Sequence, residues 1–324
     1  MKNDLIPTID NYKEGGLEFI RISNNVGLSV TFTSLGAAIY SIKYLGEEMS
    51  LQTNDLKEFV KEGFYNGKAI GPVAGRIPNG EFVVSKKAYK IKPNEGKNVL
   101  HGGKDGISNK EFSIRSFATA EHIHVVYTYF SSYGEGGYPG YGLYEVHYIL
   151  HNNEPKLKVK LLSYVSEKRP VSLTLHTYFS LGEDNLEKTT MQINASKYLD
   201  INPKDLLLKS AKDVPSYLDF RKAKPVLKDI NAKEMNHGML KGYDHCFVFD
   251  EVNENIPQVI LENDKYKVDV YTDFDSVIIY SDNDAKGGKR RGVAVEPQLN
   301  PNGSRLLSRK QEFDHHITYF FTKK

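Results

Sequence analysis

Residues 122–150 read HIHVVYTYFSSYGEGGYPGYGLYEVHYIL and predict a long β-hairpin. Val125–Phe130 and Tyr144–Leu150 are rich in valine, isoleucine and aromatic residues, which favour strands. A glycine-rich loop separates the two runs, and strand-like runs joined by turn residues are typical of antiparallel pairing. The stretch therefore indicates antiparallel β structure.

The same signals recur along the chain. Further strand-like runs bounded by turn residues are Phe19–Ser23, Gly27–Phe32, Glu81–Val84, Ala88–Ile91, Lys156–Leu162, Tyr266–Thr272 and Ser276–Ser281. Helical periodicity is scarce, and we expect only short helices, at Asp55–Glu62 and Ser216–Phe220. No repeat or linker divides the sequence, so residues 1–324 are predicted to form one large antiparallel domain, a β-sandwich of two packed sheets.

Composition limits the classes of function. Lys and Arg number 43 against 41 Asp and Glu, a net charge of +2 that gives no electrostatic case for nucleic acid or an anionic membrane surface. The single cysteine excludes an intrachain disulfide and suits a reducing compartment. No stretch has the length of a signal peptide core or a membrane helix. We expect a soluble cytoplasmic protein, whose oligomeric state the sequence leaves open.

Residues 172–181, SLTLHTYFSL, place a histidine within a strand-like run. With a period of two, Leu173 and Leu175 share one face, whereas His176 and Tyr178 share the other with Ser172 and Thr174. A hydroxyl-rich face that carries a histidine is the lining expected where a hydroxylated ligand binds. The alternative is a histidine on a solvated sheet face, bonded to a neighbouring hydroxyl.

Residues 292–302, GVAVEPQLNPN, place Glu296 at the predicted end of an apolar strand, where Pro297 ends regular pairing. A carboxylate fixed in this way is a plausible general base, since its reference pKa of about 4.3 leaves it ionised at neutral pH. The alternative is an ordinary charged residue at a strand end.

Three shorter stretches add polar groups. NVLHGG sets His101 before two glycines, which allow a tight turn or a close approach to a ligand. GPVAGRIPNG surrounds Arg76 with small residues, and its guanidinium suits hydroxyl or carboxylate recognition. In GYDHCFVF, Asp244 begins a predicted strand. Consecutive residues of a strand point to opposite faces, so the Asp-His-Cys triplet is a poor metal site. The alternatives are a histidine at a hairpin corner and a surface arginine.

Taken in order, these stretches resemble the motifs of the aldose 1-epimerase family, the galactose mutarotases. The matching stretches are GPVAGRIPNG, NVLHGG, EGGYPG at 135–140, SLTLHTYFSL, GYDH and AVEPQ. The resemblance spans roughly residues 19–321. It implies a galactose mutarotase-like β-supersandwich with its site on the concave face of a large sheet.

The resemblance also implies a reaction, the interconversion of the α and β anomers of a free hexose such as galactose or glucose. By motif, Glu296 is the base that deprotonates the C1 hydroxyl, and His176 is the acid that protonates the ring oxygen O5. His101 stabilises charge on O5 or shares in the protonation. Sugar hydroxyls are expected to bind Arg76 and Asp244, together with Asn79 and Tyr178 of the same motifs. No metal or organic cofactor is expected, because no hydride, phosphoryl or acyl group moves.

Three other functions remain open. A hexose-6-phosphate 1-epimerase needs a cationic phosphate pocket, for which Lys286–Arg291 (KGGKRR) is a candidate if it is not simply a solvated loop. A non-catalytic carbohydrate-binding protein could keep the same fold. A glycoside hydrolase or lyase could use Asp244 and Glu296 as its two carboxylates, but that leaves both histidine motifs unexplained. The preferred sugar is not determined by the sequence.

Overall fold

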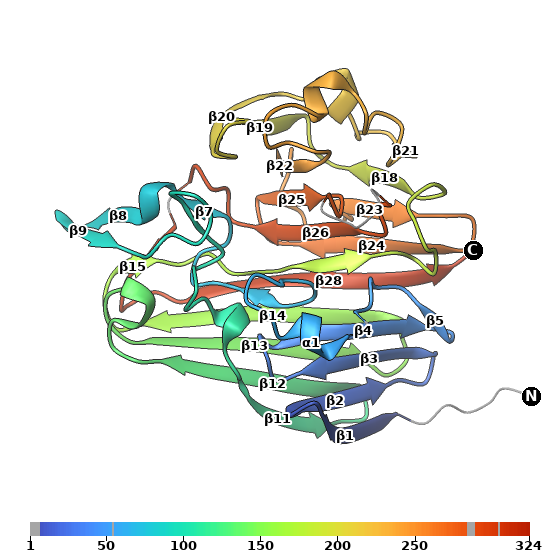
Figure 1. Cartoon of the computed structure of the whole chain (residues 1–324). Helices are drawn as coiled ribbons and strands as arrows, with labels where there is room; N and C mark the ends of the chain where they lie inside the picture. Colours follow the sequence, from blue (N-terminus) through green and yellow to red (C-terminus); the bar gives the residue numbers. More distant parts are fainter. Residues whose placement is uncertain (1–6, 54, 284–288, 304) are drawn as a thin grey trace, which may run out of the picture.

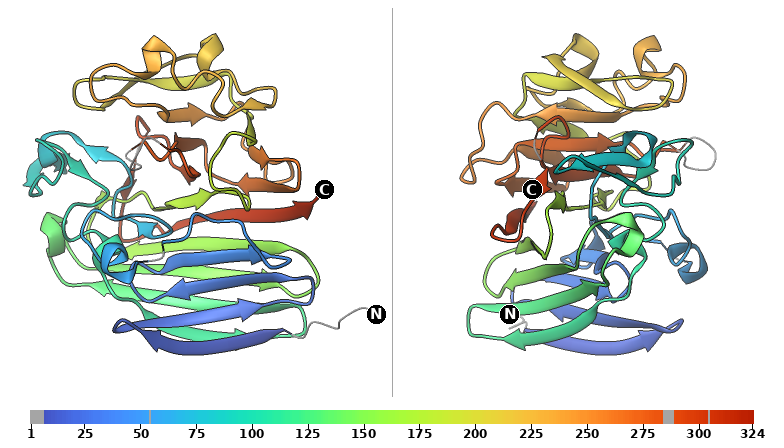
Figure 2. Two further views of the ribbon diagram at one scale, coloured as in Figure 1. Left: turned by 45° about the vertical axis from the view of Figure 1, so that its right-hand side comes forward. Right: turned by 90° about the vertical axis from the view of Figure 1, so that its left-hand side faces the viewer.

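The computed structural model describes residues 7–53, 55–283, 289–303 and 305–324. Antiparallel strands dominate it, and the larger sheets pack in two layers (Figure 1, Figure 2). The predicted all-β sandwich is therefore confirmed. The prediction of a single domain over residues 1–324 stays a prediction.

One layer is a nine-stranded sheet. In spatial order its strands are β11 (Ser113–Ala118), β12 (His122–Ser131), β13 (Gly142–His151), β14 (Lys156–Val165), β28 (Phe313–Lys323), β24 (Tyr266–Thr272), β23 (Val259–Glu262), β18 (Thr190–Ile193) and β21 (Lys224–Pro225). The predicted hairpin is confirmed as β12 and β13, with Val125 opposite Tyr148. Both residues face the main hydrophobic core.

Part of the second layer is a five-stranded sheet. Its strands are β1 (Thr8–Glu14), β2 (Leu17–Ser23), β3 (Leu28–Thr33), β4 (Ala38–Tyr44) and β5 (Glu47–Glu48). Phe32 stacks on Tyr148 of the nine-stranded sheet with ring centroids 4.2 Å apart. The helix α1 (Leu56–Phe59) packs Phe59 in a separate apolar cluster with Phe19. This helix is shorter than the predicted Asp55–Glu62.

The rest of the second layer is a six-stranded sheet. Its strands are β17 (Thr177–Phe179), β26 (Val293–Gln298), β25 (Ser276–Tyr280), β22 (Asp244–Val248), β19 (Lys197–Ile201) and β20 (Leu208–Asp213). Phe179 packs edge-on against Tyr319 of β28, with ring centroids 5.2 Å apart. The second layer is thus two sheets side by side along the nine-stranded sheet, which corrects the prediction of two sheets in all.

Short elements connect the layers. Four two-stranded pairs are β6 (Ala69–Ile70) with β16 (Thr174–Leu175), β7 (Arg76–Ile77) with β10 (Val99–Leu100), β8 (Glu81–Val84) with β9 (Lys87–Lys90), and β15 (Arg169–Pro170) with β27 (Leu306–Leu307). The 3₁₀ turns are η1 (Pro78–Gly80), η2 (Ile107–Asn109), η3 (Glu135–Gly137), η4 (Ser216–Leu218) and η5 (Lys233–Met235). The second predicted helix is therefore a 3₁₀ turn. Among the described residues, no helix has the length and apolarity to cross a membrane.

Candidate active site

Strand register in the six-stranded sheet brings distant residues together on the face turned away from the nine-stranded sheet. Asp244 of β22 lies opposite Tyr280 of β25, which in turn lies opposite Ala294 of β26. On the other side of β26, Tyr178 of β17 also lies opposite Ala294. Glu296 lies two residues beyond Ala294 and so shares its face. This face carries two predicted binding residues and the predicted base.

His176 occupies the break between β16 and β17. Its backbone N–H donates to the Lys68 carbonyl at 3.0 Å, and its carbonyl accepts from the Gly67 N–H at 2.8 Å. The predicted single strand is thus two short strands, and the whole of 172–181 is buried, including its hydroxyl-bearing residues. The predicted alternation is right in placing His176 with Tyr178, since their ring centroids lie 5.1 Å apart. The alternative of a solvated histidine is wrong, because His176 is only 7% exposed.

Glu296 lies inside β26 rather than at its end, which corrects the prediction. Pairing with β25 continues through Pro297, opposite Val277, and stops at Gln298. Pairing with β17 does end before Glu296, at Val295. Glu296 is 2% exposed, so its carboxyl group lies in a site almost closed to water.

His101, His176 and Glu296, the three residues predicted to be catalytic, form a group whose ligand atoms all lie within 4.8 Å of one another, and we call it the catalytic cluster after that prediction. His176 Nε2 is 3.3 Å from Glu296 Oε1. Burial lowers the pKa of His176 to about 4. Burial, together with the negative charge of Asp244, raises the pKa of Glu296 well above its usual value. The sequence could not predict this proximity, which the structure establishes.

His101 is held in one orientation by a reciprocal contact with Gly75. Its backbone N–H donates to the Gly75 carbonyl at 3.0 Å, and its Nδ1 accepts from the Gly75 N–H at 3.3 Å. The proton of the neutral ring therefore lies on Nε2. His101 has φ of 53°, and Gly102 follows with φ of 82° and passes close to the Gly71 carbonyl. Gly102 therefore allows a close approach to backbone, and the predicted close approach to a ligand stays a prediction.

Arg76 lies beside the cluster and is fixed by two carboxylates. Its Nε and Nη2 donate to the two oxygens of Glu95 at 2.6 and 2.8 Å, and Nη2 lies 3.6 Å from Asp244 Oδ2. The side chains of all three residues are largely buried. Glu95 was missed by the sequence reasoning, since nothing in its loop marks it as a partner of Arg76.

Two tyrosines that the sequence reasoning missed also contact the histidines. The Tyr65 ring centroid lies 4.7 Å from that of His101 and 6.0 Å from that of His176. Tyr280 lies edge-on to His176 at 6.4 Å. Tyr65 lies in the loop before β6 and Tyr280 in β25, and no single-sequence signal distinguishes them from the other tyrosines, because their positions depend on the tertiary fold.

Asn79 is set apart from these contacts. It is exposed in η1, with φ of 53°, and its N–H donates to Asn98 Oδ1 at 3.2 Å. Its role in sugar binding stays a prediction.

The catalytic cluster has the residue types of a metal site but poor electrostatics for one. Binding an ion through either ring nitrogen of His101 would break its bond with Gly75, because Nδ1 would have to become a ligand or carry the proton. The Arg76 guanidinium also acts on His101 and lowers its pKa, after burial and His176. The arrangement fits proton transfer to and from a neutral hydroxylated ligand better than cation binding.

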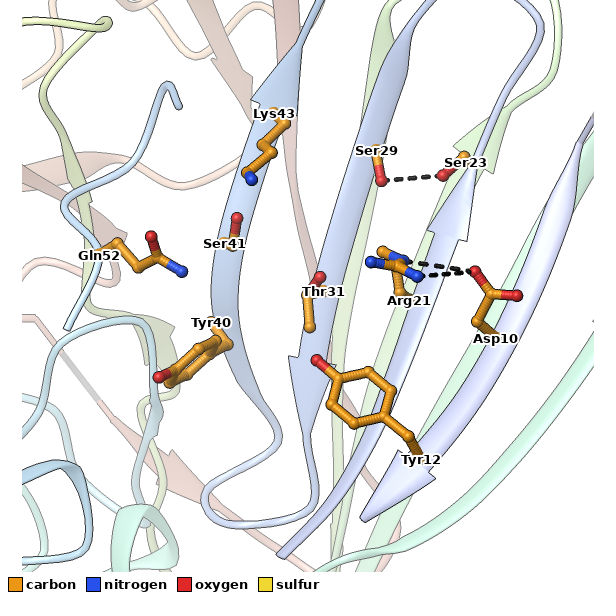
Figure 3. Close-up of a pocket in the computed structure, with 10 residues that line it drawn as sticks. All are labelled: Asp10, Tyr12, Arg21, Ser23, Ser29, Thr31, Tyr40, Ser41, Lys43 and Gln52. Carbon is orange, nitrogen blue, oxygen red and sulfur yellow. Dashed lines mark hydrogen bonds and ion pairs between the residues drawn. The ribbon is translucent and has the colours of Figure 1, made fainter. Parts of the chain in front are cut away.

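A separate cavity of about 450 Å³ lies on the outer face of the five-stranded sheet (Figure 3). Its lining projects from β1 to β4, with Gln52 from the loop after β5, and includes an Arg21–Asp10 ion pair at 3.2 Å and a Ser23–Ser29 hydrogen bond at 2.8 Å. None of its lining residues belongs to the catalytic cluster.

Comparison with known proteins identifies relatives over nearly the whole chain. The family model described as aldose 1-epimerase matches residues 18–311. The aldose 1-epimerase of Escherichia coli strain K12 is 26% identical over 300 residues, covering 89% of this chain and 85% of that protein. The maltose epimerase of Levilactobacillus brevis is 25% identical and covers 94% of both. The crystal structure of a galactose 1-epimerase from Lactobacillus acidophilus NCFM superposes with a TM-score of 0.89 at 26% identity, over 98% of this chain and 99% of that one.

Proposed function

Since the chain belongs to the aldose 1-epimerase family and is an isomerase of that class, we propose that it interconverts the anomers of free hexoses such as galactose or glucose with Glu296 and His176 as its acid/base pair. The observation that carries this assignment is the 3.3 Å contact between His176 Nε2 and Glu296 Oε1 in a buried site. General acid/base catalysis needs two such groups within hydrogen-bond reach of the substrate.

The pair is suited to share one proton. Burial lowers the pKa of His176 and raises that of Glu296, so each group is shifted toward its uncharged form, and the 3.3 Å contact lets a proton pass between them. One group can then donate while the other accepts, whichever of the two carries the proton. That symmetry matches a reaction that runs in both directions with the roles exchanged.

When the shared proton is on His176, Glu296 accepts the proton of the C1 hydroxyl and His176 donates its proton to O5 as the C1–O5 bond breaks. The open aldehyde turns about the C1–C2 bond. Attack by the C5 hydroxyl on the other face closes the ring, while His176 takes back its proton and Glu296 returns one to O1. Atoms and charges balance without any further reagent.

The remaining residues bind and orient the sugar. His101 directs an Nε2–H into the cluster and donates a hydrogen bond to O5 as charge develops there, rather than transferring a proton. The Arg76 guanidinium and the Asp244 carboxylate hold sugar hydroxyls, and the Tyr178 ring lines the site beside His176. Asn79 reaches the sugar from the rim.

The reaction takes place in the cytoplasm in this proposal. The single cysteine, which is buried, supports a reducing compartment.

Polarimetry tests the proposal. Freshly dissolved α-D-galactose and α-D-glucose are followed at neutral pH, with and without a catalytic amount of protein, in the presence of EDTA. We expect a faster approach to the same final rotation. No acceleration with either sugar would overturn the proposed substrates.

The alternative function of a hexose-6-phosphate 1-epimerase has a specific candidate phosphate site, Lys286–Arg291. Residues 286–288 of its candidate run lie outside the described residues, whereas Arg291 donates to Asp282 at 2.9 Å. That pairing neutralises one of the cations the run would need. Acceleration with a hexose 6-phosphate alone would favour this alternative, and acceleration with maltose alone would favour the reducing end of a disaccharide.

A further inference from the structure

The outer face of the nine-stranded sheet carries a second group of histidines. In β12 and β13 the core-facing residues alternate with half-buried polar ones, so His124 and His147 both project away from the main core. The two strands are neighbours (Figure 1), and His147 lies opposite Val126, one diagonal step from His124. His124, His147 and Glu145 are called the outer cluster below.

The outer cluster has a defined hydrogen-bond order. His124 Nε2 lies 3.1 Å from His147 Nδ1. On the other side of the same ring, His147 Nε2 lies 3.5 Å from Glu145 Oε2, and Thr128 Oγ1 donates to Glu145 Oε1 at 3.2 Å. A carboxylate accepts only, so the His147 proton lies on Nε2 and its Nδ1 presents a lone pair toward His124.

The spacing of the two nitrogens matches that of two ligands on one ion. With metal–nitrogen bonds of about 2.0–2.1 Å, two ligands lie about 2.9 Å apart at a right angle and about 3.3 Å apart at the tetrahedral angle. The observed 3.1 Å falls between these values. The Glu145 carboxylate behind His147 is the partner that metal-bound imidazoles usually have, since it fixes the tautomer and strengthens the ligand.

We propose that His124 Nε2 and His147 Nδ1 bind a divalent transition-metal ion, with Glu145 as the positioning residue behind His147. Binding requires only that the His124 proton move to Nδ1. Both rings are half-buried, so water completes the coordination shell. The ion bridges two strands of the hairpin and is remote in chain and sheet from the catalytic cluster.

The surrounding charges select the class of ion. The positive charges of Arg115 and Lys160 act on His147 and repel a cation. An ion with a strong preference for imidazole is therefore needed, and the expected order is Cu²⁺ ahead of Ni²⁺ and Zn²⁺, with Mg²⁺ and Ca²⁺ not bound.

Titration of the tag-free protein with Cu²⁺, followed by electron paramagnetic resonance and calorimetry, tests the proposal. We expect one ion per chain with hyperfine splitting from two nitrogens. Both H124Q and H147Q should weaken binding at least tenfold and remove the two-nitrogen signal. Because it acts through His147, E145Q should weaken binding by about 10–100-fold while keeping that signal.

Two variants separate this site from other groups of metal-ligating residues. Glu254, Asp273 and His316 form another group of suitable atoms, so H316Q is the first control. The second is H176Q, which removes one ligand of the catalytic cluster. Both should bind Cu²⁺ as the unmodified chain does. No binding by the unmodified chain, unchanged binding in H124Q and H147Q, or loss of binding in either control would overturn the proposal.

Discussion

The catalytic cluster and the outer cluster consist of the same residue types, two histidines and one glutamate, yet their surroundings prepare them for different chemistry. In the catalytic cluster, all three residues are buried, and His176 Nε2 lies 3.3 Å from Glu296 Oε1. In the outer cluster, the two histidines face each other at 3.1 Å, and the carboxylate lies behind one of them. The first arrangement shares a proton between an acid and a base, whereas the second sets two ring nitrogens at the spacing of two ligands on one ion.

The partner of one ring nitrogen decides this difference, because it fixes the tautomer of the histidine. A Gly75 N–H occupies Nδ1 of His101 and leaves Nε2 as a donor. A carboxylate occupies Nε2 of His147 and leaves Nδ1 as an acceptor. A donor favours a developing oxyanion, and an acceptor favours a cation. Residue type alone therefore does not define a site, because the partner of the second ring nitrogen determines what the first can do.

The largest expected difference between the clusters is in turnover. Replacing Glu296 with glutamine removes the proton acceptor at constant volume, and we expect kcat to fall by about 10²–10⁴-fold with KM little changed. The matched change at Glu145 in the outer cluster should leave kcat unaltered. Polarimetry on both variants checks this, with circular dichroism to confirm the fold. Near-normal turnover in E296Q would show that Glu296 is not the base.

The sequence predicts most of this site but not its assembly. Period-two alternation and turn residues locate the hairpin, the strand at Asp244 and the strand that contains Glu296, since these signals are local. Register is not local, so neither the His176–Glu296 contact nor the place of Tyr280 opposite Asp244 could be predicted.

Two errors have the same origin. Glu296 was expected at a strand end because proline lacks an N–H, yet Pro297 lies within β26 where pairing on one side has already stopped. The partner of Arg76 was also missed, because Glu95 belongs to a loop whose path depends on the fold around it. Rules based on single residues predict the local structure that a segment favours, whereas its tertiary neighbours determine where its strand ends and which side chains it contacts.

A smaller effect than the loss of kcat is expected for substrate affinity. Arg76, which lies beside the catalytic cluster, is the residue that tests it. Hydrogen bonds to charged groups contribute about 1.5–3 kcal/mol, so R76A should raise KM about 10–100-fold while kcat changes less. E95Q should raise KM less than R76A, because Arg76 keeps its contact with Asp244. Steady-state kinetics on the two variants test the order. A fall in kcat at constant KM in R76A would instead show that Arg76 stabilises the transition state.

The smallest expected effect is on the free energy of unfolding. His245 tests it, because this histidine is buried but lies outside the catalytic cluster. His245 follows Asp244 in β22 but faces the other side, where its Nδ1 accepts from the Asp244 N–H at 3.1 Å, and burial lowers its pKa to about 4. In the unfolded chain a histidine binds its proton near pH 6.5, whereas in the folded chain it does so only near pH 4. The free energy of unfolding therefore falls as pH drops through this window.

Between pH 7 and pH 5, this one group should reduce the free energy of unfolding by about 2 kcal/mol. H245Q should remove that part of the pH dependence and keep kcat, since its side chain faces away from the catalytic cluster. Urea unfolding of both proteins at the two pH values measures the difference. An equal loss of stability in H245Q and the unmodified chain would show that burial of His245 does not resist protonation.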